Sequence, residues 1–237
     1  MKGDTNFVLV HGAWHGGWCW KHVAKNIRQH GFNVYTPTLT GLGERSHLIS
    51  NKITLNTFVN DVSGLIEWEQ LENIVLVGHS FGGLAAIGVA DKLPERIKHV
   101  VLLDAFLLNN NQSTMESLPS TVVDKLRAIA KQHDGLTIPA PSASSLGISD
   151  PEQARWVESL CTPHPISSYE SKFYIKNKIG NSLPVTYIAV EPEYIPTSGA
   201  RDYAKSRSDW NYITIEAGHD AMVTHPELLA TLLIDLA

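Results

Sequence analysis

The sequence predicts an α/β protein with a doubly wound, mostly parallel sheet of about six strands and a helical cap inserted into it. Short, unbroken apolar runs alternate with helical periodicity, which is typical of a parallel sheet covered on both faces. In the segment Asn73–Gly83, NIVLVGHSFGG, an apolar strand turns directly into a helix. From about Leu108 to Ser182 the alternation stops, which indicates an insertion.

Each element of the first hundred residues has its own pattern. Apolar runs that end at Gly, Pro or a polar residue predict buried strands, and apolar side chains at i, i+3, i+4 and i+7 predict amphipathic helices. The Gly-, Thr- and Ser-rich stretch 36–50 predicts an irregular loop. In chain order, we expect a strand at Phe7–Val10, a helix at Gly17–His30, a strand at Phe32–Tyr35, a helix at Thr54–Glu69, a strand at Ile74–Val77, a helix at Leu84–Ala90 and a strand at Lys98–Leu103.

The segment from Leu108 to Ser182 lacks strand signals. It contains two stretches with a helical pattern, Val122–Lys131 and Glu152–Leu160, and polar linkers. A structureless loop of this length is uncommon in a compact domain. We therefore interpret the segment as a helical cap, which lies over Ser80 in the turn from strand to helix within Asn73–Gly83.

The sheet resumes after this insertion. We expect strands at Pro184–Val190 and Tyr212–Glu216, a helix near Ser198–Ser206 and a C-terminal helix at Pro226–Leu236. The predicted division is an α/β core of residues 1–107 and 183–237 and a cap of residues 108–182.

Length, composition and charge narrow the class of protein. The chain has 237 residues, of which 43% are hydrophobic and 18% charged, and this suits one domain with a substantial core. Its 24 acidic and 19 basic residues give a net charge of −5, and no basic run is present. These features argue against a nucleic-acid or membrane partner and favour a small neutral ligand.

The cysteines and the start of the sequence predict a cytoplasmic location. Cys19 and Cys161 form no disulfide framework pattern, so we expect two reduced thiols. The first residues carry no basic stretch followed by an apolar run long enough for export or membrane insertion.

The stretch Gly78–Gly82, GHSFG, matches the pattern G-x-S-x-G between a strand and a helix. A chain that turns from strand to helix within about one residue strains the corner residue and exposes its side chain at the carboxyl edge of the sheet. We therefore predict that Ser80 is a nucleophile. The backbone N–H groups of Phe81 and of Ala13, in the loop after the first strand, are the predicted oxyanion donors.

A serine hydroxyl needs a base, and the base needs an orienting carboxylate. His219 is the predicted base among the eleven histidines, because it follows the last strand at the same sheet edge as Ser80. The sequence leaves three candidates for the orienting carboxylate. Glu193, in the loop after the penultimate strand, is the first choice, with Asp104, at the end of the strand before the cap, and Glu191 as alternatives.

No pattern for a metal or an organic cofactor is found, and none is expected. His11 and His15 are spaced like a metal pair, but they lie on a predicted loop without an intervening glutamate base. The stretch Gly78–Gly83 lacks the G-x-G-x-x-G order of a dinucleotide site.

Longer motifs carry a family resemblance over essentially the whole chain. They are HGAWHGGWCW at 11–20, PTLTGLGERSH at 37–47, GHSFGG at 78–83, LLDAF at 102–106, CTPHPISSY at 161–169 and AGHDAM at 217–222. With them the chain resembles the α/β-hydrolase superfamily, in the branch of plant hydroxynitrile lyases, plant methylesterases and bacterial esterase relatives. The resemblance implies the same nucleophile, base and oxyanion donors. It also implies an acid after the penultimate strand, where the branch usually has Asp and this chain has Glu191 or Glu193.

The resemblance also bears on the reaction. The lyases of this branch have a lysine directly after the catalytic histidine, to hold developing cyanide, and a threonine where this chain has Gly12. Here Asp220 follows His219, and a negative side chain cannot stabilise cyanide. We therefore favour hydrolysis of carboxylic esters through an acyl-enzyme. The alternatives are cyanohydrin or carbon–carbon bond cleavage on the same scaffold, and a non-catalytic ligand-binding receptor.

Apolar and aromatic cap residues favour a small-to-medium hydrophobic ester as substrate. Trp14, Trp156 and Phe173 are the candidate pocket residues, and each suits packing in a core equally well. The exact substrate, the pathway and the oligomeric state, including a homodimer, are left open.

Overall fold

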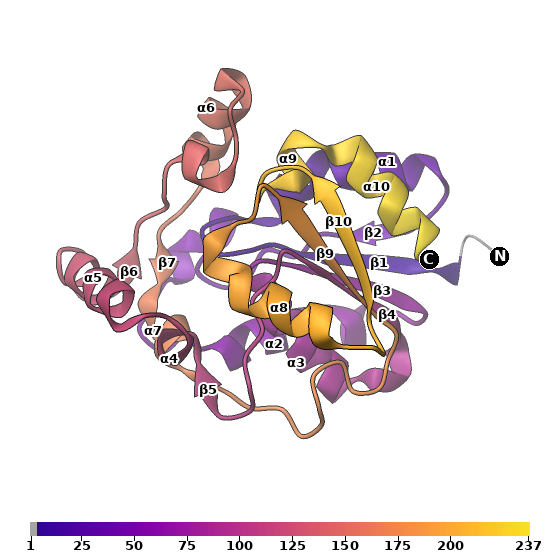
Figure 1. Ribbon diagram of the computed structural model, residues 1–237, viewed down its shortest axis with the longest axis horizontal. Helices are drawn as coiled ribbons and strands as arrows, with labels where there is room; N and C mark the ends of the chain where they lie inside the picture. Colours follow the sequence, from indigo (N-terminus) through magenta and orange to yellow (C-terminus); the bar gives the residue numbers. More distant parts are fainter. Residues whose placement is uncertain (1–3) are drawn as a thin grey trace.

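Six parallel strands form the central sheet in the computed structural model, which describes residues 4–237 (Figure 1). Their order is β10-β9-β4-β3-β1-β2, and each adjacent pair is parallel. The predicted fold class is confirmed. The strands are β1 (Asn6–Val10), β2 (Asn33–Tyr35), β3 (Ile74–His79), β4 (Ile97–Leu103), β9 (Val185–Glu191) and β10 (Asn211–Glu216).

Helices cover both faces of the sheet (Figure 1). Val8 and Leu76 belong to one core with α2, α3 and α8, whereas Phe7 and Val75 belong to a second core with α1 and α10. Since both faces of each inner strand are buried, these strands read as unbroken apolar runs. The helices are α1 (Lys21–Gln29), α2 (Leu55–Trp68), α3 (Gly82–Lys92), α8 (Ser198–Ser206), α9 (Ala221–Thr224) and α10 (Pro226–Asp235).

Short 3-10 helices refine several predicted boundaries. The predicted helix Gly17–His30 begins as a 3-10 turn at Gly17–Trp20 before α1, and the predicted loop 36–50 contains another at Gly43–Leu48. Further 3-10 helices lie at Pro94–Arg96, Ala143–Leu146 and Ile195–Thr197.

Residues 108–182 add short elements outside the central sheet. The two predicted helical patches are present as α5 and α6, and two antiparallel pairs, β5 with β8 and β6 with β7, tie the segment together. Two-residue strands are too short to leave a periodic signal in a sequence. The elements are β5 (Gln112–Ser113), α4 (Thr114–Ser117), α5 (Ser120–Lys131), β6 (Thr137–Ile138), α6 (Pro151–Leu160), β7 (His164–Pro165), α7 (Ile166–Glu170) and β8 (Lys172–Phe173).

The parallel arrangement brings the carboxyl ends of the strands to one edge, on the left in Figure 1, beside the segment 108–182. Loops that follow five of the strands therefore lie close together. They carry, in chain order, His11–His15 after β1, Ser80 after β3, Asp104 after β4, Tyr194–Thr197 after β9 and Gly218–Asp220 after β10.

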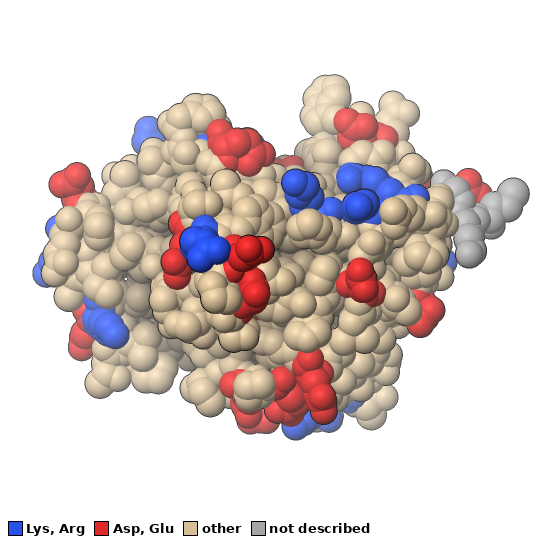
Figure 2. Space-filling model, turned by 90° about the horizontal axis from the view of Figure 1, so that it is seen from above, with Lys and Arg blue, Asp and Glu red and all other residues tan. Residues whose placement is uncertain are grey.

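Figure 2 shows the molecule from above, with acidic and basic side chains mixed on the visible face. Within residues 4–237, none of the helices combines the length and the apolar character needed to span a bilayer.

Candidate active site

Ser80 lies at the turn from β3 to α3 with φ at 52°. This left-handed conformation costs a non-glycine residue roughly 1–3 kcal/mol and persists only where neighbours hold it. The Ser80 N–H donates to the Leu103 carbonyl, and the Ser80 carbonyl accepts from the Phe106 N–H, both at 3.0 Å. A Cβ on Gly82 would lie 2.2 Å from the His11 carbonyl oxygen. Glycine at this position therefore lets the loop after β1 pack directly on the elbow.

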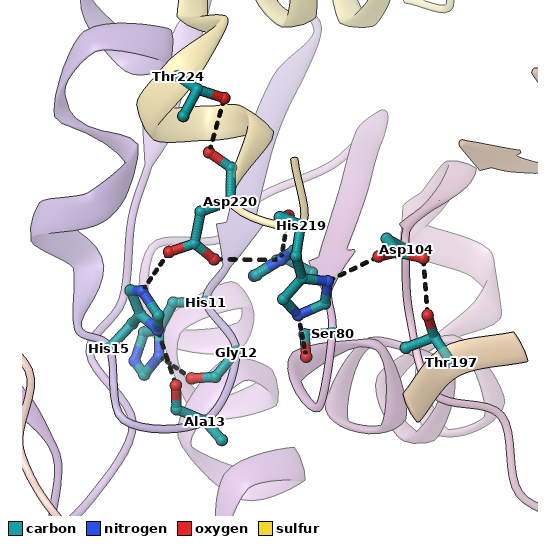
Figure 3. Close-up of polar contacts among 11 residues, drawn as sticks. His11, Gly12, Ala13, His15, Ser80, Asp104, Thr197, His219, Asp220 and Thr224 are labelled. Atoms are coloured by element: carbon teal, nitrogen blue, oxygen red, sulfur yellow. Dashed lines mark hydrogen bonds and ion pairs between the residues drawn. The ribbon is translucent and has the colours of Figure 1, made fainter. Parts of the chain in front are cut away.

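A chain of hydrogen bonds joins Ser80, His219 and Asp104 (Figure 3). Ser80 Oγ lies 2.9 Å from His219 Nε2, and His219 Nδ1 lies 2.6 Å from Asp104 Oδ2. When Nδ1–H donates to the carboxylate, Nε2 presents a lone pair to the serine hydroxyl. Ser80 and His219 are only 5% and 4% exposed, so little water screens these contacts.

The structure corrects the first choice for the acid. Glu193 is exposed, and Glu191 forms an ion pair with Arg201, so neither glutamate contacts His219. Asp104, an alternative from the sequence, contacts it instead. Because β4 pairs directly with β3, the end of β4 lies beside the elbow, whereas β9 lies one strand further away.

The loop after β9 contacts Asp104 and His219 through residues other than its glutamates. The Thr197 hydroxyl donates to Asp104 Oδ1 at 2.8 Å, and the Tyr194 ring stacks on the His219 ring with centroids 3.7 Å apart. Burial and then the charges of Asp220 and Asp104 raise the pKa of Tyr194 to about 12, so its phenol stays neutral at pH 7. Neither residue is recognisable from the sequence, because a loop Tyr or Thr carries no local signal of such contacts.

The loop after β1 approaches Ser80 from the other side, as a Cβ on Gly12 would lie 2.9 Å from Ser80 Cβ. His11 Nδ1–H donates to the Gly12 carbonyl at 2.8 Å, and His11 Nε2 accepts from the Leu39 N–H at 3.0 Å. Both ring nitrogens are satisfied in the neutral form, and burial lowers the pKa of His11 to about 3. Because the peptide unit is planar and trans, fixing the Gly12 carbonyl also fixes the N–H of Ala13, a predicted oxyanion donor.

Trp14 continues this loop with φ at 66°, and residues of the segment 108–182 hold it there. Its carbonyl accepts from the Thr162 N–H at 2.8 Å, and its indole N–H donates to the Ile138 carbonyl at 3.1 Å. His164 Nδ1 lies 3.5 Å from the Trp14 backbone nitrogen, and the His164 ring contacts Phe81, with centroids 5.0 Å apart. The segment 108–182 therefore contacts the elbow and the loop after β1 directly.

The pH dependence of the free energy of unfolding below pH 7 tests whether buried histidines such as His164 are neutral in the folded protein. Burial lowers the pKa of His164 to about 3 from an ordinary 6.5, so between these values the unfolded chain binds one more proton than the folded chain at this site. Folding free energy is then lost as pH falls, by about 1.4 kcal/mol per pH unit for each such histidine. We expect His164→Gln to make the free energy of unfolding, measured with urea between pH 6 and pH 4.5, fall less steeply than in the wild type. An unchanged slope would contradict the neutral, buried state of His164.

Two of the predicted pocket residues lie away from Ser80. Trp156 packs against Trp18 and His22, with ring centroids 5.2 and 5.7 Å away. Phe173 lines a cavity of about 410 Å³ between α2, α3 and β8 whose lining residues do not include Ser80. Both predictions are corrected, because these rings are used in packing. Trp14 alone of the three belongs to a loop that contacts the elbow.

The ligand atoms of one buried group, His79, His219 and Asp220, lie within 4.8 Å of one another. Each is already engaged, since His79 Nε2–H donates to the His219 carbonyl at 3.0 Å and Asp220 binds His15. A metal ion there would have to replace these hydrogen bonds and those of His219. The spaced pair His11 and His15 binds separate partners.

Comparisons with known proteins agree with the observed fold. A model described as the alpha/beta hydrolase family matches residues 7–232. A carbendazim hydrolyzing esterase of Nocardioides sp. is 36% identical over 95% of this chain and 97% of its own length, and salicylic acid-binding protein 2 of Nicotiana tabacum is 25% identical over 100% and 98%. An extracellular alpha/beta-hydrolase from a Paenibacillus species has a similar structure, with a TM-score of 0.84, 24% identity, and coverage of 98% of this chain and 99% of that one.

Proposed function

The chain belongs to the alpha/beta hydrolase family, and from this membership and the site geometry we propose that it is a serine carboxylesterase for small-to-medium hydrophobic esters. The observation that carries the proposal is the continuous hydrogen bonding from Asp104 through His219 to Ser80. The esterase that is 36% identical over nearly its whole length supports ester hydrolysis as the reaction.

In the acylation step, the Ser80 hydroxyl attacks the ester carbonyl carbon while its proton moves to His219 Nε2. Asp104 stabilises the imidazolium that forms, since it already accepts the Nδ1–H. The N–H groups of Ala13 and Phe81 bind the oxyanion of the tetrahedral intermediate. The carbon–oxygen bond to the alcohol then breaks, and the alcohol leaves with the proton from His219.

In the deacylation step, a water molecule attacks the acyl-enzyme and gives its proton to His219. The second tetrahedral intermediate uses the same two N–H donors. Its collapse breaks the bond to Ser80 Oγ, which takes the proton back and releases the carboxylic acid.

The surroundings of the elbow favour an apolar substrate. Phe81 stacks on Tyr169 with centroids 4.7 Å apart, and it also contacts Phe58 and His164. These rings, together with Trp14, place aromatic surface beside the nucleophile. Since a relative is named for hydrolysis of carbendazim, that compound is a test substrate for this chain.

We also propose that residues 108–182 act as a cap over Ser80 and that the protein is cytoplasmic. The contacts of Thr162 and Ile138 with Trp14 support the first proposal. The free thiols of Cys19 and Cys161 support the second. Trp14→Phe, which removes the indole N–H that donates to the Ile138 carbonyl, and fractionation of the native host cell are the respective tests.

The experiment that tests the function measures turnover of p-nitrophenyl esters from acetate to octanoate, together with carbendazim and mandelonitrile. We expect a burst of p-nitrophenolate equal to the concentration of sites labelled by a fluorophosphonate probe. Cyanide release from mandelonitrile without a phenolate burst would instead identify a lyase. A protein that resists the probe and hydrolyses none of the esters would be a receptor.

A further inference from the structure

A buried ion pair joins the loop after β1 to the loop that carries the base. His15 Nε2 lies 3.0 Å from Asp220 Oδ2, and the two residues are 1% and 0% exposed. His15 lies two residues after Ala13, and Asp220 directly follows His219. The pair therefore connects the proposed oxyanion loop with the proposed base, as Figure 3 shows.

The hydrogen bonds of His15 determine its charge. Its Nδ1 lies 2.7 Å from the Ala13 carbonyl oxygen, and its Nε2 faces the Asp220 carboxylate. Both partners can only accept, so both ring nitrogens must donate, and only the imidazolium does this. Burial alone would lower the pKa of His15, but the Asp220 carboxylate outweighs it and raises the pKa. Burial would raise the pKa of Asp220, and the charge of His15 lowers it instead.

The second carboxylate oxygen of Asp220 is directed toward the base. Oδ1 has no hydrogen-bond partner among residues 4–237 and lies 3.9 Å from His79 Nε2. The His79 ring is 4.6 Å from the His219 ring, and its Nε2–H donates to the His219 carbonyl. Burial and then the charge of His219 lower the pKa of His79, so this ring is neutral. The Asp220 carboxylate is thus paired with His15 through Oδ2, while Oδ1 has no donor and faces the layer behind His219.

Each end of the ion pair is attached to backbone that is held firmly. The Asp220 N–H donates to the Leu146 carbonyl at 3.1 Å, and Gly218 packs so closely on Gly147 that a Cβ there would lie 2.5 Å from the Gly147 carbonyl oxygen. At the other end, His15 holds the carbonyl of Ala13, next to Trp14 in its strained conformation. The pair thus ties a rigid base loop to a loop that needs external support.

We propose that His15 and Asp220 are positioning residues for ester hydrolysis, which hold the oxyanion loop in register with His219 and favour the imidazolium that forms on His219 during each step. The inference rests on the proposed function. It assigns a role to a carboxylate that lies outside the chain from Asp104 to Ser80.

The main test is Asp220→Asn, which keeps the shape of the side chain and removes its charge. We expect kcat per active site to fall about 10- to 100-fold with KM changed by less than about twofold, because the interaction strengthens as the transition state forms. The groups that face His219 are Ser80, Asp104, His79, Tyr194 and Asp220. The variant loses the negative charge of Asp220 and, with it, the proton of His15. Because the Asp220 carboxylate lies between His15 and His219 and within 4.8 Å of a His219 ring nitrogen (Figure 3), the loss of the negative charge dominates, and the acid limb of the kcat/KM profile should move to lower pH. Altered folding alone would not produce this shift.

A second variant and a double variant test whether the two residues act together. His15→Gln should also lower kcat, and it carries the test if Asp220→Asn does not fold. The double variant should be no slower than the slower single variant, because each single change already removes the pair.

The matched control is Asp61→Asn. The Asp61 carboxylate accepts from the Thr40 N–H at 2.7 Å and pairs with Arg45 at 3.5 Å, and these contacts do not involve His219. This variant should lower the unfolding temperature without moving the pH profile. Fluorophosphonate titration gives the number of active sites in every sample. If Asp220→Asn and His15→Gln keep the wild-type kcat per labelled site, the inference is wrong while the proposed function stands. If the wild type is neither labelled nor active, both are wrong.

Discussion

Ser80→Ala is expected to lower kcat/KM for p-nitrophenyl esters by about 10⁴- to 10⁶-fold and to abolish the phenolate burst. Without the hydroxyl no acyl-enzyme can form, and the proton that His219 would accept is absent. The residual rate would come from the oxyanion donors and from substrate binding alone. Steady-state rates and fluorophosphonate labelling measure both effects.

Folding must be checked beside this loss, because Ser80 is in a strained conformation. Alanine tolerates this conformation about as badly as serine, so we expect little change in the free energy of unfolding. Ser63→Ala is the matched control, since Ser63 is a buried serine on α2 that contacts Lys92 and has no proposed role in the reaction. If Ser80→Ala retains full turnover, the nucleophile is another residue.

Asp104→Asn is expected to lower kcat by about 10⁴-fold, whereas Glu193→Gln and Glu191→Gln should stay within about twofold of the wild type. An asparagine amide can donate to His219 Nδ1, which would move the ring proton to Nε2. The nitrogen that faces Ser80 would then have no lone pair for the hydroxyl proton. Full pH profiles of kcat/KM compare the three variants.

This comparison decides the acid, because Glu191 ends β9, Glu193 follows β9 and Asp104 follows β4, and both strands end at the same edge of the sheet. A large loss in Glu193→Gln together with an active Asp104→Asn would reverse the assignment that the geometry supports. The unfolding transition of Asp104→Asn is the control, since the Asp104 carboxylate also accepts from Thr197.

The sequence favoured Glu193 as the acid, whereas Asp104 is the carboxylate that contacts His219, and this difference has a physical reason. The order of strands and loops in the sequence places the backbone of Glu191, Glu193 and Asp104 at one edge of the sheet. It does not determine which residues their side chains contact. Arg201 lies in α8 and binds Glu191, which removes that glutamate from the site. The chain then turns so that Tyr194 and Thr197 contact His219 and Asp104, and Glu193 points to solvent. These contacts depend on side chains from several elements.

The positions of the aromatic side chains could not be predicted from the sequence either. Trp14, Trp156 and Phe173 are equivalent by composition, yet only Trp14 lies on a loop that packs on the elbow. The ion pair of His15 and Asp220 left only indirect signals, namely a histidine spacing that resembled a metal pair and an aspartate where related lyases have lysine. Residues 205 positions apart have no local pattern that joins them.

The amino-acid sequence alone predicted the parallel α/β sheet, the proposed nucleophile Ser80 and the choice of His219 among the histidines as the proposed base. Each of these depends on short-range features, which are apolar runs, a strand that turns into a helix, and a polar residue directly after a strand. Tertiary structure alone decided which carboxylate contacts the base, which aromatic ring lies near the elbow and which buried charges compensate each other. Those outcomes depend on distances of a few ångströms between loops, and such distances are set by packing of the whole chain.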